Sequence, residues 1–211
     1  LFDLVRVDHF RGFADYWAIP AGAPNAIDGK WLPGPGDALF EAFISAFGEL
    51  PIIAEDLGLI TPEVIALRDR FNLPGMRILQ FAFGEDDRNY FLPHHYIVNA
   101  VAYTGTHDND TCAGWWQTAA EHERNFARAY LHTEGDEINW RMMEALSASV
   151  ANAVIFPLQD VLGLDSAHRM NLPGTAGGNW EWRYTSQLMA DCDTSRLAGI
   201  AARDRRNPRV A

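Results

Sequence analysis

Three stretches of this sequence decide its fold: LVRVDHFRG at residues 4–12, PIIAEDLG at residues 51–58 and AYTGTHDND at residues 102–110. In each stretch a short apolar run ends abruptly in a polar segment that contains an acid. Buried parallel strands have this pattern, because both faces are covered until the chain emerges at the carboxyl end of the sheet. The pattern predicts three parallel strands whose carboxyl ends carry Asp8, Glu55 and Asp108.

The remaining sequence predicts further strands and the helices that connect them. Asp37 is a plausible N-cap, and Thr61 followed by Pro62 is typical of a helix start. The predicted strands are 4–7, 51–54, 77–83, 98–104 and 153–156; the predicted helices are 37–47, 62–71, two within 114–150 that separate near 134–136, and 186–203.

Alternation of strands with helices predicts an α/β fold with parallel strands and right-handed crossovers. The segment between the first two strands is longer than a connecting helix requires, and it contains PAGAP at residues 20–24 and LPGPG at residues 32–36. Long connections of this kind carry function more often than structure. We therefore expect a loop that folds over the carboxyl ends of the strands.

Three acids at the carboxyl ends of parallel strands favour a particular chemistry. Barrel enzymes keep their active sites at that end of the strands. Cleavage of a glycosidic bond uses a nucleophilic carboxylate, a carboxylic acid that donates a proton, and support for a positively charged transition state. Arg6 lies two residues before Asp8 and therefore points to the same face of the strand, where its charge would keep Asp8 ionised. Neighbouring acids and a partly apolar pocket would keep Glu55 protonated.

Composition and charge restrict the partners. The chain has 211 residues, a formal net charge of −11 and a pI near 4.9, which argue against nucleic acid and anionic membranes as partners but allow a neutral sugar. Cys112 and Cys192 are the only cysteines, and no apolar run reaches membrane-spanning length. We expect no signal peptide and a cytoplasmic protein. Because Leu1 begins inside a strand-like run without a Met, we expect the C-terminal part of a longer protein.

The sequence resembles the 4-α-glucanotransferases, also called amylomaltases or disproportionating enzymes, of glycoside hydrolase family 77 in the α-amylase clan. The resemblance covers nearly all of the chain, with its motifs in order. The motifs are RVDHFRGF (6–13), YWAIP (16–20), GKW (29–31), GPG (34–36), EDLG (55–58), GMRILQFAF (75–83), TGTHDNDT (104–111), PLQDVLGL (157–164) and NWEWR (179–183).

The resemblance implies an incomplete (β/α)8 TIM barrel, with about strands 4 to 8 and their helices, formed by residues 1–211 as a single domain. It also implies that Asp8 is the nucleophile, Glu55 the general acid/base and Asp108 the transition-state stabiliser. The expected activity is a retaining transfer of α-1,4-glucan segments to an acceptor glucose or maltooligosaccharide. No cofactor and no metal are implied, and the N-terminal half of the same enzyme is expected upstream.

Five further residues are expected to bind the substrate. By resemblance, Arg6 supports the nucleophile and His107 contacts the sugar at subsite −1. His9 and Asn109 belong to the same motifs, and Trp31 lies in a Pro- and Gly-rich segment that suits an aromatic sugar platform.

Several alternatives remain open from sequence. Asp56 is adjacent to Glu55 and is the easiest residue to mistake for it. The segment His107-Asp108-Asn109-Asp110, with Asp8 and His9, could instead hold a divalent metal, although it lacks the His spacing of a zinc enzyme. An α-glucan hydrolase of the same clan and an inactive sugar-binding half-barrel are the alternative functions.

Overall fold

The computed structural model describes residues 2–84 and 86–206. The chain divides into two compact units, one ending at Met76 and one beginning at Arg77. Its main sheet has the strand order β1-β4-β5-β6-β7, and the pairings β1–β4, β4–β5 and β6–β7 are parallel. The strands are β1 (Val5–Val7), β4 (Ile52–Ala54), β5 (Gly75–Ile78), β6 (Ala100–Tyr103) and β7 (Ala153–Ile155). Parallel strands joined through helices confirm the predicted α/β class.

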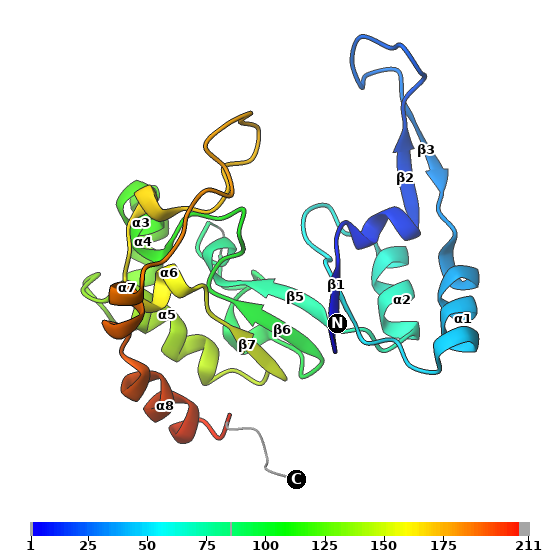
Figure 1. The fold of residues 1–211 in the computed structure, drawn as a ribbon. Coiled ribbons are helices and arrows are strands. Elements are labelled where there is room, and N and C mark those ends of the chain that lie inside the picture. The colour runs from blue at the N-terminus through cyan, green and yellow to red at the C-terminus, as the bar shows by residue number, and fades with distance from the viewer. Residues whose placement is uncertain (1, 85, 207–211) are drawn as a thin grey trace. The chain divides into compact units, whose positions relative to one another are not determined.

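The first unit packs two helices against its strands. Helix α1 (Gly36–Phe47) follows a hairpin, and α2 (Pro62–Arg70) connects β4 to the start of β5 (Figure 1). Their apolar faces meet the 3-10 turn Phe10–Phe13 in one core. The buried residues of this core are Phe10, Phe40, Ala54, Val64, Leu67 and Leu73. Burial of these aromatic and aliphatic side chains fixes the end of β1 and of β4, where Asp8 and Glu55 follow.

A two-stranded antiparallel hairpin interrupts the connection between β1 and α1. It consists of β2 (Asp15–Ala18) and β3 (Lys30–Pro33), and Figure 1 shows it extending away from α1 and α2. Trp17 lies opposite Trp31 in the register, and its indole N–H donates to the carbonyl of Ala26 at 2.9 Å. The expected long loop therefore contains a paired ribbon, and residues 19–29 form the loop that connects its two strands.

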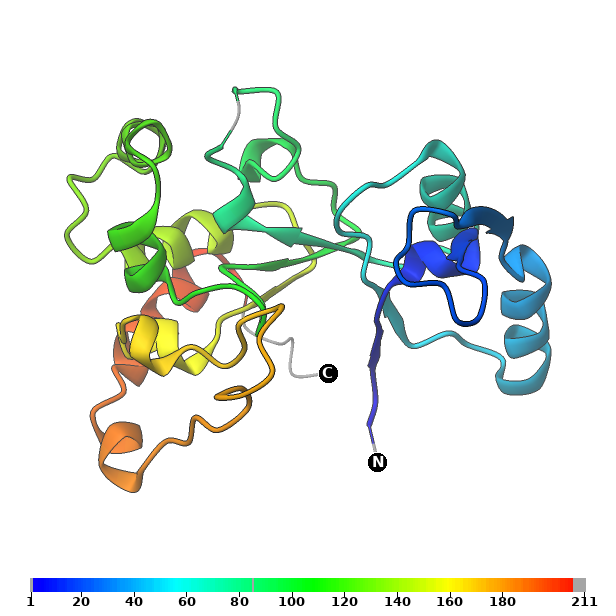
Figure 2. The same cartoon turned by 90° about the horizontal axis from the view of Figure 1, so that it is seen from above.

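The second unit arranges its helices around α5. Helix α5 (Ile138–Ser147) contacts α3 (Cys112–Thr118), α4 (Glu121–Leu131), α6 (Leu158–Val161) and α8 (Thr194–Arg203), while α7 (Ser186–Ala190) lies just before α8 in the chain. Figure 2 shows this group beside β6 and β7. All four residues of β6 are buried, which is why its sequence is apolar throughout. The loop after β6 carries His107, Asp108 and Asn109.

The observed elements differ from the predicted ones in places. Helix α1 begins at Gly36 after Pro35, so Asp37 lies in its first turn and is not the N-cap. The strand predicted at 77–83 is β5, which runs from Gly75 to Ile78 and then tightens into the 3-10 turn Leu79–Phe81. The stretch 114–150 lies in three helices instead of two, and the predicted final helix is split in two.

Side chains at the helix starts accompany the extra helix boundaries. Glu123 Oε2 accepts a hydrogen bond from the Ala120 N–H at 2.7 Å where α4 starts, and Asp193 accepts from the Arg196 N–H and starts α8. These caps satisfy backbone donors that a helix leaves unpaired at its start. Apolar periodicity continues across them, so periodicity alone predicted longer helices.

Candidate active site

Asp8 follows β1 and carries an ion pair with Arg6. Arg6 Nη2 lies 2.9 Å from Asp8 Oδ1, as expected for two side chains at i and i+2 on one face of a strand. The Asp8 side chain is 77% exposed, whereas that of Arg6 is 27% exposed. Arg6 Nε also donates to Met76 Sδ at 3.3 Å. Arg6 is thus anchored, and it presents a fixed positive charge to a carboxylate that faces solvent.

Glu55 follows β4 and is held by main-chain donors. Its Oε2 accepts from the His9 N–H at 2.7 Å, and its Oε1 accepts from the Leu57 N–H at 2.9 Å. His9 has φ 49° and ψ 51°, a left-handed conformation that turns its N–H toward the carboxylate. The structure therefore places Arg6, Asp8, His9 and Glu55 together at the carboxyl ends of β1 and β4.

The environment of Glu55 shifts its acidity. Burial raises the pKa of Glu55 above its ordinary value, and the charge of Asp8 adds a smaller increase. The two main-chain hydrogen bonds and the positive charge of Arg6 lower this pKa in part. The net direction is upward, so Glu55 holds a proton to a higher pH than an exposed glutamate. A general acid needs this property.

Asp56, the residue most easily mistaken for Glu55, has a structural role. Its side chain is 3% exposed and lies 2.5 Å from Arg68 Nη1, and its Oδ1 accepts from the Met76 N–H at 2.7 Å. A Cβ at Gly75 would lie 2.4 Å from Asp56 Oδ2, so only glycine fits there. Asp56 joins α2 to the start of β5 and is turned away from solvent.

Trp31 lies on the exposed hairpin, as part of a cluster of three side chains. It packs against Trp17 with ring centroids 5.3 Å apart and planes at 66°. The Arg11 guanidinium lies over the Trp31 ring, 4.2 Å from its centroid, and is itself bonded to Asp15. Trp31 remains 49% exposed. An exposed, rigid indole is suited to stacking on a sugar ring, and the exposed Trp17 beside it shares this property, which sequence analysis did not consider.

In the second unit, the loop after β6 places His107, Asp108 and Asn109. Asn109 Oδ1 accepts from the Thr106 N–H and the Thr106 hydroxyl, each at 2.9 Å. His107 Nε2 lies 3.3 Å from Asp108 Oδ2. The His107 ring packs against Trp180 with centroids 4.9 Å apart. This loop has a defined conformation in which Asn109 supports the backbone that presents His107 and Asp108.

Asp108 has partners more than sixty residues away in the chain. Asn171 Nδ2 donates to Asp108 Oδ1 at 2.5 Å, and Arg169 Nη2 donates to the Asp108 carbonyl at 2.6 Å. Sequence analysis did not identify Arg169 or Asn171 as functional. Trp180 lies in a motif that carried the family resemblance, which is the one signal that pointed to this segment.

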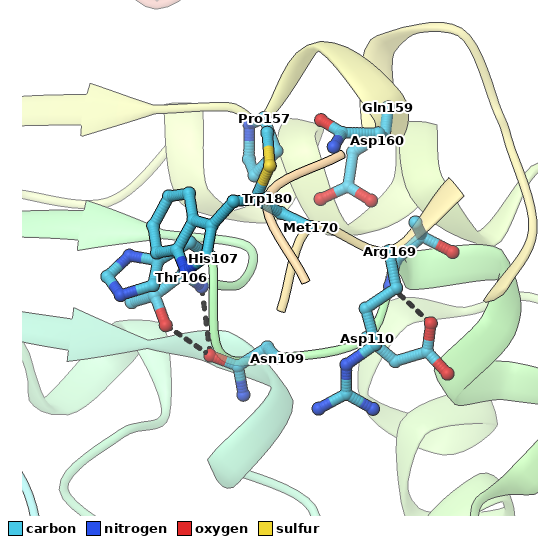
Figure 3. Close-up of a pocket in the computed structure, with 11 residues that line it drawn as sticks. Thr106, His107, Asn109, Asp110, Pro157, Gln159, Asp160, Arg169, Met170 and Trp180 are labelled. Atoms are coloured by element: carbon cyan, nitrogen blue, oxygen red, sulfur yellow. Dashed lines mark hydrogen bonds between the residues drawn. The ribbon is translucent and has the colours of Figure 1, made fainter. Parts of the chain in front are cut away.

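A pocket of about 160 Å³ adjoins this loop, and Figure 3 shows its lining. His107, Asn109 and Trp180 line one part, and Arg169 and Met170 line another. The full lining is Thr106, His107, Asn109, Asp110, Thr111, Pro157, Gln159, Asp160, Arg169, Met170 and Trp180. Ser166 Oγ donates to Asp110 Oδ2 at 2.7 Å, so Asp110 connects the loop to the turn Ser166–His168.

Asp160 is the buried anchor of this pocket. It accepts from the Thr104 hydroxyl at 2.5 Å and from the Cys112 N–H at 2.7 Å. Burial raises the pKa of Asp160. Burial and the adjacent Asp160 also raise the pKa of the Cys112 thiol well above its ordinary value. Asp160 therefore ties β6, α3 and α6 together and belongs to the scaffold.

The described residues contain neither a cluster of metal ligands nor a membrane-spanning helix. Within 2–84 and 86–206, no group of three or more His, Cys, Asp or Glu side chains is placed to hold a metal ion. In the same part of the chain no helix has the length and apolarity needed to cross a membrane.

Asp8 and Glu55 belong to the first unit, and Asp108 belongs to the second. That all three acids meet in one active site therefore stays a prediction.

Comparison with known proteins decides the family. The model of the glycoside hydrolase family 77, described as 4-alpha-glucanotransferase, matches residues 1–189. The chain belongs to this family. The 4-alpha-glucanotransferase of Thermus thermophilus is 50% identical over 209 residues, which cover 95% of this chain and 42% of the relative. That of Synechocystis is 53% identical over 201 residues, which cover 94% of this chain and 40% of the relative.

A solved structure of the same family confirms the partial barrel. Amylomaltase from Streptococcus agalactiae in complex with acarbose matches 97% of this chain and 42% of its own chain, with a TM-score of 0.90 and 36% identity. Amylomaltase from Corynebacterium glutamicum matches with a TM-score of 0.64 and 18% identity, which supports the fold alone. The chain spans about two fifths of the length of the Thermus thermophilus and Synechocystis relatives.

Proposed function

We propose that the intact enzyme carrying this chain is a 4-α-glucanotransferase that transfers α-1,4-glucan segments by a retaining double displacement. One observation carries the proposal. Arg6 pairs with Asp8, while burial raises the pKa of Glu55, which directly follows the neighbouring strand β4. Two carboxyl groups with opposite environments suit a nucleophile and a proton donor.

The first half of the reaction breaks the glycosidic bond. Asp8 attacks the anomeric carbon, and the carbon–oxygen bond to the leaving sugar breaks as Glu55 gives its proton to that oxygen. The product is a glycosyl ester on Asp8 and a shortened glucan with a new 4-hydroxyl group. Glu55 is left ionised and can accept hydrogen bonds from the His9 and Leu57 N–H groups.

The second half forms the new bond. Glu55 removes the proton from the 4-hydroxyl of an acceptor glucose or maltooligosaccharide, whose oxygen attacks the anomeric carbon and releases Asp8. The configuration is retained because two displacements occur. The proposal requires the two carboxyl groups to lie about 5–6 Å apart, since retaining enzymes need no room for a water molecule between them. A separation near 9 Å in a sugar complex would contradict it.

Asp108 would face the positive charge that develops on the sugar in both steps. His107 and Asn109 would contact the same sugar ring, and Trp31 would stack on a more distant one. The acceptor groove and the remaining barrel strands would come from the rest of the enzyme, which we place upstream of this chain. A cytoplasmic location is part of the proposal.

Maltotriose distinguishes a transferase from a hydrolase. A transferase converts two molecules of maltotriose into glucose and maltopentaose, so glucose appears while the total number of reducing ends stays constant. A hydrolase of the same clan increases the number of reducing ends. Binding of maltotriose with no products would indicate a sugar-binding protein. The experiment measures glucose and reducing ends together on the intact enzyme, and a rise in reducing ends equal to the glucose released would overturn the proposal.

A further inference from the structure

The segment 169–180 forms a closed loop in the second unit. The Trp180 N–H donates to the Met170 carbonyl at 2.7 Å, which brings the two ends of the segment together. Asn179 Oδ1 accepts from the Leu172 N–H at 2.8 Å, and its Nδ2 donates to Thr175. Trp180 has φ 64°, a left-handed conformation that is costly for a bulky residue. These bonds hold the segment in one conformation.

Two side chains of this closed loop reach the segment that follows β6. The Arg169 guanidinium donates Nε to the Asn171 carbonyl at 2.7 Å and Nη2 to the Asp108 carbonyl at 2.6 Å. Arg169 therefore joins the two backbones. Asn171 adds a single side-chain contact, from its Nδ2 to Asp108 Oδ1 at 2.5 Å.

The contact from Asn171 determines the direction of the Asp108 carboxylate. The Asp108 side chain is 47% exposed, so packing alone does not select its rotamer. With Oδ1 bonded to Asn171, the other oxygen faces His107 at 3.3 Å. His107 is in turn held by the Trp180 ring. Asn171 therefore fixes Asp108 Oδ1, and Asp108 Oδ2 is directed toward His107.

We propose that Asn171 is a positioning residue that acts on the reaction through Asp108. The inference rests on the proposed function, in which Asp108 stabilises the transition state. A stabilising charge contributes fully only when it is already oriented before the reaction, because reorientation costs energy at the moment of reaction. Removing the donor should therefore slow the chemical step and leave sugar binding nearly unchanged.

Three variants of the intact enzyme test this role. Asn171→Ala removes the donor, and Asn171→Asp keeps the shape but places a second carboxylate against Asp108. Asn179→Ala is the matched control, because it removes an amide from the same loop without touching Asp108. We measure kcat and KM for maltotriose, maltotriose binding, and the thermal unfolding temperature of each variant.

We expect Asn171→Ala to lower kcat on the order of 10–100-fold with little change in KM or in maltotriose binding. Asn171→Asp should lower kcat further, because the like charge repels Asp108. Asn179→Ala should keep most of the kcat of the unmodified enzyme. If Asn171→Ala fails to fold, the isosteric Asn171→Asp variant carries the comparison.

Two results would overturn the inference. Equal loss of kcat in Asn171→Ala and Asn179→Ala would show that loop order alone matters. Full activity in Asn171→Asp would show that the donated hydrogen bond is not used. Failure of the proposed function is distinguishable, because the unmodified enzyme would then either release no glucose from maltotriose or release it with an equal rise in reducing ends.

Discussion

Glu55 and Asp108 both follow a buried strand, yet they are held by different kinds of partner. Glu55 accepts from two main-chain N–H groups, those of His9 and Leu57. Asp108 accepts from a side chain, that of Asn171, which lies 63 residues away. Main-chain donors remain when side chains are exchanged, whereas a single substitution removes a side-chain donor. The orientation of Glu55 should therefore tolerate changes nearby, and that of Asp108 should depend on particular residues.

The largest expected effect lies in the region of Glu55. Asp8→Asn keeps the shape of the nucleophile but removes its negative charge, so we expect kcat to fall by about 10⁴-fold or more in the intact enzyme. Sugar binding should persist, because the amide still fits. The measurements are glucose release from maltotriose and isothermal binding of maltotriose. Comparable turnover in the variant would show that Asp8 is not the nucleophile.

The 211-residue chain on its own tests whether the regions around Glu55 and Asp108 work without the rest of the enzyme. Strands β1 and β7 stand at the two ends of the strand order, and Val5 and Ile155 are 48% and 43% exposed. Edges of this kind recruit other strands, and a closed barrel needs eight strands. We expect the isolated chain to associate and to show almost no disproportionation.

Size-exclusion chromatography and the maltotriose assay give the result for the isolated chain. A monomer with full activity would contradict the prediction. It would also show that both regions are complete within these residues.

The scaffold beneath Glu55 gives a prediction about stability. Asp56→Ala leaves the Arg68 charge buried without its closest partner, so we expect a loss of about 3–5 kcal/mol in the free energy of unfolding. Asp69→Ala is the matched control, because Asp69 pairs with the same arginine but is 56% exposed. Its expected cost is within about 1 kcal/mol. Denaturant unfolding measures both, and equal losses would refute the assigned role of Asp56.

The smallest predicted effect is a shift in pH dependence. Activity should fall as the pH rises through the raised pKa of Glu55, because the general acid must be protonated. Arg6 lowers that pKa, so Arg6→Gln should raise it further and move the alkaline limb of kcat/KM to higher pH. The measurement compares the pH at which kcat/KM falls in the variant and in the unmodified intact enzyme. This position does not depend on any loss in overall rate. A downward shift would show that Arg6 does not act on Glu55 in this way.

Local spacing in the sequence was enough to predict the region around Asp8 and Glu55. Arg6 and Asp8 are two residues apart on one strand, and Glu55 directly follows the next strand, so strand geometry alone implied their proximity. The motifs of the family then supplied the roles, which stay predictions. The α/β class followed from the alternation of apolar strands and amphipathic helices, and the structure confirms it.

The parts that sequence analysis missed depend on contacts between distant residues. Nothing near Asn171 in the sequence indicates that its amide reaches Asp108. The β2–β3 hairpin was predicted as a loop, because its Pro and Gly residues obscure the pairing of Trp17 with Trp31. Helix ends were misplaced where a side-chain cap such as Asp193 interrupts an apolar pattern that continues beyond it.

The two cysteines differ in a way that matters for chemical labelling. Cys112 is buried against Asp160, and its raised pKa keeps it as the unreactive thiol at neutral pH. Cys192 is partly exposed, in the short link between α7 and α8. A maleimide dye or a spin label will therefore attach to Cys192 first, without any engineered cysteine. The scaffold role of Asp160 thus leaves this chain with one addressable position for spectroscopy.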